Sequence, residues 1–239
     1  MLIADTDEEE HPFSFEMLCE VNSIRNGLAK YVELSHEIEK MLDQKEHEIG
    51  TQLSETLKRT PGNRHQDVHE SYALDLLDYE STFRFLQREA IFLTLYNYFE
   101  HFLNKLCEWI GAEVKSRVRL GDINGRGITR ALLFLDLIPE FKFDRIPDVM
   151  TTIRGSNSLR NVIVHAGTVL PQDTKHPVNQ FVKSNPHLRG DPGQPVSLGA
   201  DFVADFAKTL HAFFDEFDAQ MQAYMDRTWR KAQDDEATA

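Results

Sequence analysis

Cysteine is scarce in this chain, which has only Cys19 and Cys107 among its 239 residues. Two cysteines cannot supply the several cross-links of a small secreted scaffold, so a reducing cytoplasm is the expected compartment. The sequence also lacks a long uncharged stretch, and an acidic run at residues 7–10 stands where a secretory signal has basic and apolar residues. We therefore expect a cytoplasmic protein with no membrane span and no membrane partner.

Two common kinds of ligand site are missing as well. The glycine-containing segment at residues 121–127 matches neither a phosphate loop nor a dinucleotide-binding fingerprint. His65 and His69 are one helical turn apart, but the glutamate of a metalloprotease helix and a third ligand are absent. The expectation is a protein with no cofactor and no metal site.

The chain has fewer basic than acidic residues, and its formal net charge is -13. A surface of this sign repels the phosphate backbone of nucleic acids, which argues against nonspecific binding. The charge is uneven, however, because residues 1–50 sum to -9 and residues 201–239 to -5. Residues 114–160 carry nine lysines and arginines against five acidic residues. This stretch is either a basic patch that can face a phosphate or a set of ordinary solvated helix faces.

Helical patterning is what the sequence has in abundance. Apolar residues recur at a spacing of three and four over most of the chain, and several glycine or proline clusters separate the periodic stretches. The predicted helices cover residues 13–58, 68–118, 128–138, 159–166 and 201–230. The stretch at residues 155–158 predicts a break or a new helix start. Residues 168–199 contain five prolines and predict a long loop, with a short hairpin or plain disorder as alternatives.

The fold class that follows is all-α. We expect an N-terminal helical extension at residues 1–66, a helical domain at residues 67–232 and a disordered tail at residues 233–239. The extension is the long first helix, and the proline-rich loop precedes the last helix.

The predicted helix at residues 159–166 combines an apolar stripe with three chemically capable side chains. On a helical wheel the stripe consists of Leu159, Val162, Ile163 and Ala166. Arg160, Asn161 and His165 fall outside the stripe, and Asn161 and His165 are neighbours one turn apart.

These three residue types are sufficient for RNA cleavage without a metal ion. A histidine can take a proton from the ribose 2′-hydroxyl or give one to the leaving 5′-oxygen. A guanidinium can bind the phosphate at two points and stabilise the extra charge of the transition state. An amide can hold either group in place. From spacing alone, an ordinary helix with exposed polar residues and a satisfied histidine remains the more common explanation.

The segment from Leu159 to Gly167 resembles the signature of the HEPN superfamily. That signature is an arginine, a polar residue that is usually asparagine, a few mostly apolar residues and a histidine, near the end of a late helix. The aromatic helix at residues 91–110 resembles the family's central helix, and residues 196–217 resemble its closing helix. The resemblance covers about residues 70–220. The long N-terminal helix and the proline-rich loop depart from the family's core.

The resemblance implies a metal-independent endoribonuclease that leaves a 2′,3′-cyclic phosphate. It implies a homodimer in which two motifs form one composite cleft, and a role as a toxin with an antitoxin partner or in phage defence. Arg160 would bind the scissile phosphate, Asn161 would orient the reacting groups and His165 would be the acid and base. The expected partners are therefore RNA, a second copy of the chain and an antitoxin protein.

The family often adds a polar or acidic residue from the central helix. Glu100 is the candidate for this fourth catalytic residue, with Asn104 one turn later, and a solvent-facing polar stripe is the alternative. Two other functions stay open, namely a non-catalytic HEPN module that binds a nucleotide or a partner protein, and a structural helical protein whose motif is accidental.

Overall fold

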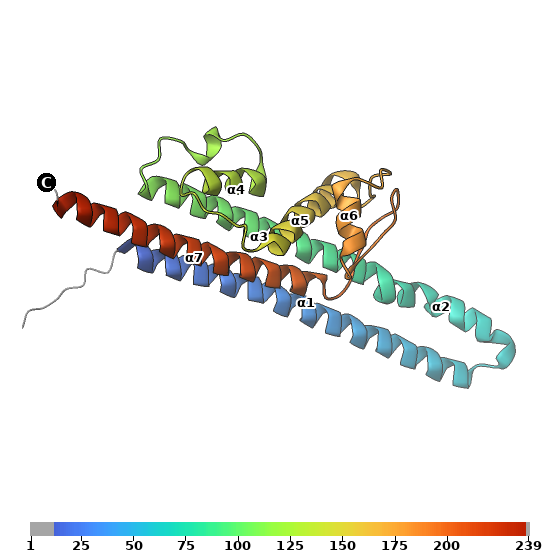
Figure 1. Ribbon diagram of the computed structural model, residues 1–239. Helices are drawn as coiled ribbons and strands as arrows, with labels where there is room; N and C mark the ends of the chain where they lie inside the picture. Colours follow the sequence, from blue (N-terminus) through green and yellow to red (C-terminus); the bar gives the residue numbers. More distant parts are fainter. Residues whose placement is uncertain (1–11, 238–239) are drawn as a thin grey trace, which may run out of the picture. The chain divides into compact units, whose positions relative to one another are not determined.

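The structure is a computed structural model that describes the backbone of residues 12–237 and the side chains of residues 19–228 and 230. The acidic run at residues 7–10 and the last two residues of the expected tail lie outside the described residues. The described α-helices are α1 (Pro12–Arg59), α2 (His65–Leu77), α3 (Phe83–Glu113), α4 (Gly127–Leu137), α5 (Pro147–Ala166), α6 (Pro177–Ser184) and α7 (Phe202–Ala237) (Figure 1). The expected all-α class is confirmed. None of the helices in the described part is both long enough and apolar enough to cross a membrane.

The chain forms two compact units, each assembled from separate stretches of sequence. The first unit comprises Met1–Leu28, Glu100–Met150 and Leu210–Ala239, and the second comprises Ala29–Phe99 and Thr151–Thr209. The boundary expected after residue 66 falls just inside α2, and residues on both sides of it belong to the second unit. Helix α7 continues to Ala237, so the boundary expected at residue 233 falls inside a helix.

The core of the first unit is built around the end of α3 and the aromatic face of α7. The ring of Phe141 packs edge-on against Phe217 with centroids 5.7 Å apart, and Phe143 stacks on Phe213 at 4.9 Å. Helix α4 approaches α3 closely, because a Cβ atom built on Gly111 would lie 3.0 Å from the ring of Phe134. These contacts hold α4 on the carboxyl end of α3 and the segment after α4 on α7.

The core of the second unit joins α3 to the beginning of α7. The ring of Phe92 packs edge-on against Phe202 and Phe206, with centroids 5.2 and 5.5 Å apart, and Tyr96 stacks on Phe206. Aromatic pairs of this geometry add to the free energy gained by burial alone. They fix the rotation of α3, which determines which of its side chains face α5.

An ion-pair cluster ties α1 to α3 within the second unit. Glu39 accepts hydrogen bonds from Arg88 Nε at 2.5 Å and from Arg84 Nη1 at 2.9 Å. Burial raises the pKa of Glu39, but the hydrogen bonds and charges of Arg88 and Arg84 outweigh it, so the pKa lies below its ordinary value. The charged form of Glu39 is therefore favoured in the folded unit, and its stabilising effect is lost as the pH falls through that lowered pKa.

The long aromatic helix expected at residues 68–118 is divided and ends earlier. A short π-helical turn, η2 (Asp78–Thr82), separates α2 from α3. Helix α3 ends at Glu113, where Lys115 adopts φ of 50° and Ser116 N donates to Gly111 O at 2.9 Å. This left-handed residue terminates the helix in the manner of a Schellman turn.

The segment at residues 168–199 is ordered, and it contains a helix that the proline-rich sequence did not predict. Helix α6 (Pro177–Ser184) has Pro177 in its first turn, a position where proline is tolerated, and His176 Nδ1 accepts a hydrogen bond from Val178 N at 3.3 Å. The suggested short hairpin is present as antiparallel β1 (Leu188–Arg189) and β2 (Ser197–Leu198), with Leu188 opposite Leu198. The disorder alternative is wrong for this segment.

Candidate functional site

Helix α5 carries the Arg160, Asn161 and His165 motif in its last two turns. It begins at Pro147 and ends at Ala166, and Gly167 follows with φ of 57°. Thr168 N then donates to Val162 O at 3.4 Å, which closes the end of the helix. The expected helix end at Gly167 is confirmed, and His165 lies in the final turn of α5.

The break expected at residues 155–158 is absent, because α5 runs through them without interruption. Gly155 is required there for packing, since a Cβ atom at this position would lie 2.2 Å from Cδ2 of Phe181 on α6. The two helices lie side by side in the second unit at this point (Figure 1). A glycine that resembles a helix breaker in the sequence is thus the place where α6 packs against α5.

The apolar stripe of α5 is buried over most of its length. Leu159, Val162 and Ile163 belong to the core, whereas Ala166 is exposed at the helix end. The stripe therefore fixes the rotation of α5. Asn161 and His165 are exposed on the opposite side, as the helical wheel predicts.

Arg160 is half-buried and is positioned by a tyrosine of α3. Its guanidinium carbon lies 6.0 Å from the centroid of the Tyr96 ring, within the range of a cation–π interaction. The Tyr96 hydroxyl donates a hydrogen bond of 2.8 Å to Asn157 Oδ1, one turn before Arg160 on α5. Tyr96 therefore contacts both turns of α5 and limits the positions that the Arg160 side chain can take.

The structure brings Arg160 and Asn161 into direct contact. Arg160 Nη1 donates to Asn161 Oδ1 at 3.2 Å. The Nε atom of Arg160 is buried and has no hydrogen-bond partner among the described residues. Because Nε is buried, an oxyanion would be bound through the Nη donors, and a guanidinium can donate two hydrogen bonds to a phosphate or carboxylate.

His165 is exposed and makes no hydrogen bond or ion pair within the described part of the chain. Its neighbour Val164 is also exposed, with 46% of its surface accessible. The imidazole is thus free to exchange a proton with a bound molecule, and an apolar residue stands beside it at the surface.

Glu100, the expected fourth site residue, belongs to the first unit, whereas the motif belongs to the second. Its carboxylate lies against the first residue of α4, since a Cβ atom built on Gly127 would be 3.1 Å from Glu100 Oε2. A negative charge near the amino end of a helix is favourable, which gives Glu100 a structural role within the first unit. Its catalytic role stays a prediction, and Asn104 is half-buried with an unpartnered Oδ1.

Tyr96 and Asn157 are site residues that the sequence did not reveal. Asn157 precedes Asn161 by one turn, so helical spacing could have predicted that it lies on the polar side of α5. Tyr96 lies in an aromatic run in which nothing distinguishes it from the core residues around it. Only the packing of α3 against α5 identifies it as the contact of Arg160.

His65, the first of the two histidines that do not form a metal site, has a structural role. His65 Nε2 lies 3.0 Å from Thr60 O and closes the turn between α1 and α2. Over the described residues, no group of three or more histidine, cysteine or acidic side chains is arranged to hold a metal ion.

Comparisons with protein-family models, with curated proteins and with solved structures found no match. The chemistry of the site therefore has to be inferred from the residues themselves.

Proposed function

We propose that this chain is a metal-independent endoribonuclease of the HEPN type. It cleaves RNA by attack of a ribose 2′-hydroxyl and leaves a 2′,3′-cyclic phosphate. The observation that carries the proposal is the arrangement on α5, where a guanidinium restrained by Tyr96, an amide and an unengaged imidazole lie within six residues.

The reaction assigns one task to each side chain. The imidazole of His165 accepts the 2′-hydroxyl proton as the 2′-oxygen forms a bond to phosphorus. The guanidinium of Arg160 binds the non-bridging oxygens, whose charge grows in the transition state. The bond from phosphorus to the 5′-oxygen then breaks, and the 5′-oxygen takes a proton from a second acid. Asn161 holds the Arg160 guanidinium by its 3.2 Å hydrogen bond.

We place the second acid in a second copy of the chain. A homodimer offers two histidines, so one imidazole can act as base while the partner subunit's His165 acts as acid. The exposed apolar side chains of Val164 and Val169 near the motif are consistent with a surface that is covered by another molecule. The resemblance to the superfamily is what supports a toxin with an antitoxin protein, or a role in phage defence.

The test is cleavage of total RNA and of tRNA in the presence of EDTA. We expect wild-type protein to yield fragments ending in a cyclic phosphate, and His165→Ala to reduce the rate by about 10²- to 10⁴-fold. Arg160→Lys keeps the charge but loses the planar fork, and we expect a loss of about 10²-fold or more.

His69→Ala is the matched control, because His69 is another exposed histidine on a helix. It should cleave at the wild-type rate, and thermal unfolding of both histidine variants should match wild type. Equal cleavage by wild type and His165→Ala would contradict the proposal. No cleavage by any form, together with saturable binding of a nucleotide or a partner protein, would favour a non-catalytic binding module.

A further inference from the structure

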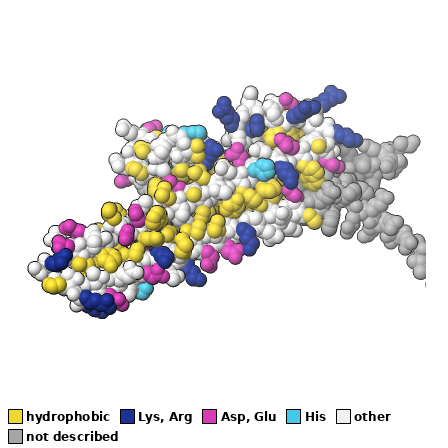
Figure 2. All heavy atoms as spheres, turned by 180° about the vertical axis from the view of Figure 1, so that it is seen from behind, with side chains coloured by type: hydrophobic (Ala, Val, Ile, Leu, Met, Phe, Trp, Pro, Cys, Tyr) yellow, Lys and Arg dark blue, Asp and Glu magenta, His cyan; other side chains and the backbone are white. Residues whose placement is uncertain are grey.

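The segment from Lys115 to Arg130 is a basic surface in a strongly acidic chain. It contains five lysines and arginines and a single acidic residue, Asp122, although the chain has a net charge of -13. None of the five basic side chains forms an ion pair among the described residues. Figure 2 shows Lys and Arg side chains gathered over this part of the first unit, around α4. A polyanion is the kind of ligand that such a surface attracts.

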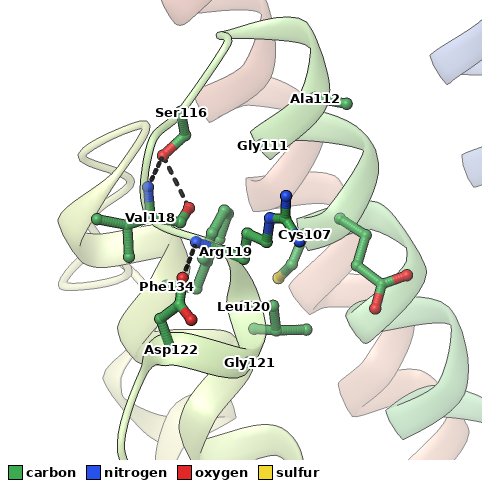
Figure 3. A pocket seen from close by; sticks show the side chains of 11 residues that line it. Cys107, Gly111, Ala112, Ser116, Val118, Arg119, Leu120, Gly121, Asp122 and Phe134 are labelled. Carbon is green, nitrogen blue, oxygen red and sulfur yellow. Dashed lines mark hydrogen bonds between the residues drawn. The ribbon is translucent and has the colours of Figure 1, made fainter.

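The same segment forms one wall of a cavity of about 450 Å³ in the first unit. The opposite wall is the last two turns of α3, and Phe134 of α4 closes the far side (Figure 3). Its volume lies within the range of about 300–1,000 Å³ that is usual for small-molecule sites. The buried side chains of Cys107, Leu120 and Phe134 make the interior largely apolar.

Local contacts keep this cavity open. Ser116 Oγ donates to Val118 O and accepts from Val118 N, at 2.8 and 3.1 Å. Arg119 N donates to Asp122 Oδ2 at 2.8 Å, which fixes the short turn η3 (Leu120–Asp122). The conformation of the loop is therefore fixed by its own hydrogen bonds, and no side chain has to fill the cavity to hold the loop in place.

One charged side chain is directed into this space. Figure 3 shows the side chain of Arg119 extending from the loop toward α3, on the side of Cys107 and Gly111. The lining also includes Asp122, whose Oδ2 accepts the hydrogen bond from Arg119 N and whose second carboxylate oxygen is a further acceptor. The cavity thus offers an apolar interior, a guanidinium and hydrogen-bond acceptors within one small volume.

We propose that this cavity holds one base of a single-stranded RNA, while the arginines of the surrounding segment bind its phosphates. A base presents flat apolar faces to the walls, and its exocyclic amino group can donate to the Asp122 carboxylate. Arg117, Arg126 and Arg130 of the same segment are not part of the cavity lining, and this spread of positive charge outside the cavity suits a polymer with repeated phosphates better than a single small acid. The choice of RNA as the polyanion rests on the proposed ribonuclease function.

Binding of a non-cleavable oligomer tests this site apart from catalysis. The probe is a fluorescent 2′-O-methyl oligocytidine of about ten nucleotides, which has no free 2′-hydroxyl to attack. A second probe of equal length and charge has ribose phosphates without bases. We expect the base-bearing probe to bind wild-type protein roughly 5- to 100-fold more tightly than the abasic probe.

Arg119→Ala should weaken binding of the base-bearing probe about 5-fold or more at 0.1 M salt. It should also reduce the slope of log Kd against log salt by about 0.7, the value for one phosphate contact on a single strand. Arg59→Ala is the matched control, because it removes an exposed arginine of α1 in the second unit that forms no ion pair among the described residues. Its Kd should change less than about twofold, because Arg59 belongs neither to the basic segment nor to the cavity lining.

Equal affinity for the two probes would overturn base insertion, and an unchanged Kd for Arg119→Ala would overturn the phosphate contact. The experiments can contradict the nucleotide site and the ribonuclease function independently of each other. RNA cleavage without this binding behaviour would remove the nucleotide site alone. Binding as expected without cleavage by wild-type protein would remove the ribonuclease alone.

Discussion

Glu89 on α3 is a carboxylate whose surroundings oppose its charge. Burial raises its pKa to about 7 from an ordinary value of 4.5, and its buried Oε1 has no hydrogen-bond partner among the described residues. The folded state therefore holds this proton more tightly than the unfolded state does. The free energy of unfolding falls as the pH rises from about 4.5 to about 7, and the loss is complete above that range.

Glu89→Gln should remove the loss of stability that the charged, buried Glu89 causes above about pH 7. We expect the substitution to raise the free energy of unfolding by about 1–3 kcal/mol at pH 8, where wild-type Glu89 is charged in both states. Below about pH 4.5 the carboxylate is protonated in both states, so little difference is expected there. Urea unfolding at the two pH values measures it, with Glu108→Gln, an exposed glutamate of the same helix, as control. An equal effect at both pH values would contradict burial as the cause.

At the residue scale, the sequence was informative where helical geometry alone decides the outcome. The spacing of Arg160, Asn161 and His165 predicted that they lie outside the apolar stripe, and they do. The contact between Arg160 and Tyr96 was not predictable, because it depends on how α3 packs against α5. The same reason hid the contact of Glu100 with Gly127, two residues separated by a loop.

At the element scale, the contact of α5 with α6 makes a second prediction. Gly155→Ala would stabilise an isolated helix by about 1 kcal/mol. In this protein the added methyl group would overlap the Phe181 ring, so we expect a net destabilisation of about 1–3 kcal/mol. Urea unfolding of the variant measures the change.

A double variant separates this overlap from other effects of the alanine. Phe181→Ala removes the ring that the new methyl group meets, and it lowers stability on its own through the cavity that it leaves. In its background Gly155→Ala should cost much less, or become stabilising. A cost that is the same in both backgrounds would show that Phe181 is not the cause.

The elements themselves were largely predicted by their apolar period. The residues of α1, α4 and α7 were located to within a few positions, apart from the carboxyl end of α7. Helix α6 was missed because eight residues between prolines are too short for a period to be visible, although Val178, Phe181 and Val182 are buried on one face. The π turn η2 was missed since its sequence fits an ordinary helix.

At the scale of the whole molecule, the proposed homodimer makes a third prediction. Val164 is 46% exposed beside His165, so Val164→Glu places a charge next to the motif without disturbing the core. We expect it to abolish dimer formation in sedimentation velocity and to abolish RNA cleavage with it. The free energy of unfolding of the isolated chain should change by no more than about 0.5 kcal/mol.

Leu74→Glu is the control for that variant, because Leu74 is an exposed apolar residue of α2 with 74% of its surface accessible. It should leave both dimer formation and cleavage unchanged. A Val164→Glu protein that is still dimeric and active would place the contact between copies elsewhere.

The two cysteines differ in a way that has a practical consequence. Cys19 is exposed on α1, whereas Cys107 is buried on α3, where burial raises the pKa of its thiol above the ordinary value. The thiolate is the reactive form, so a maleimide reagent will modify Cys19 and leave Cys107 intact while the protein is folded. The native chain can therefore carry one dye at Cys19 without any substitution. The rate at which Cys107 later reacts then measures the rate at which the first unit opens.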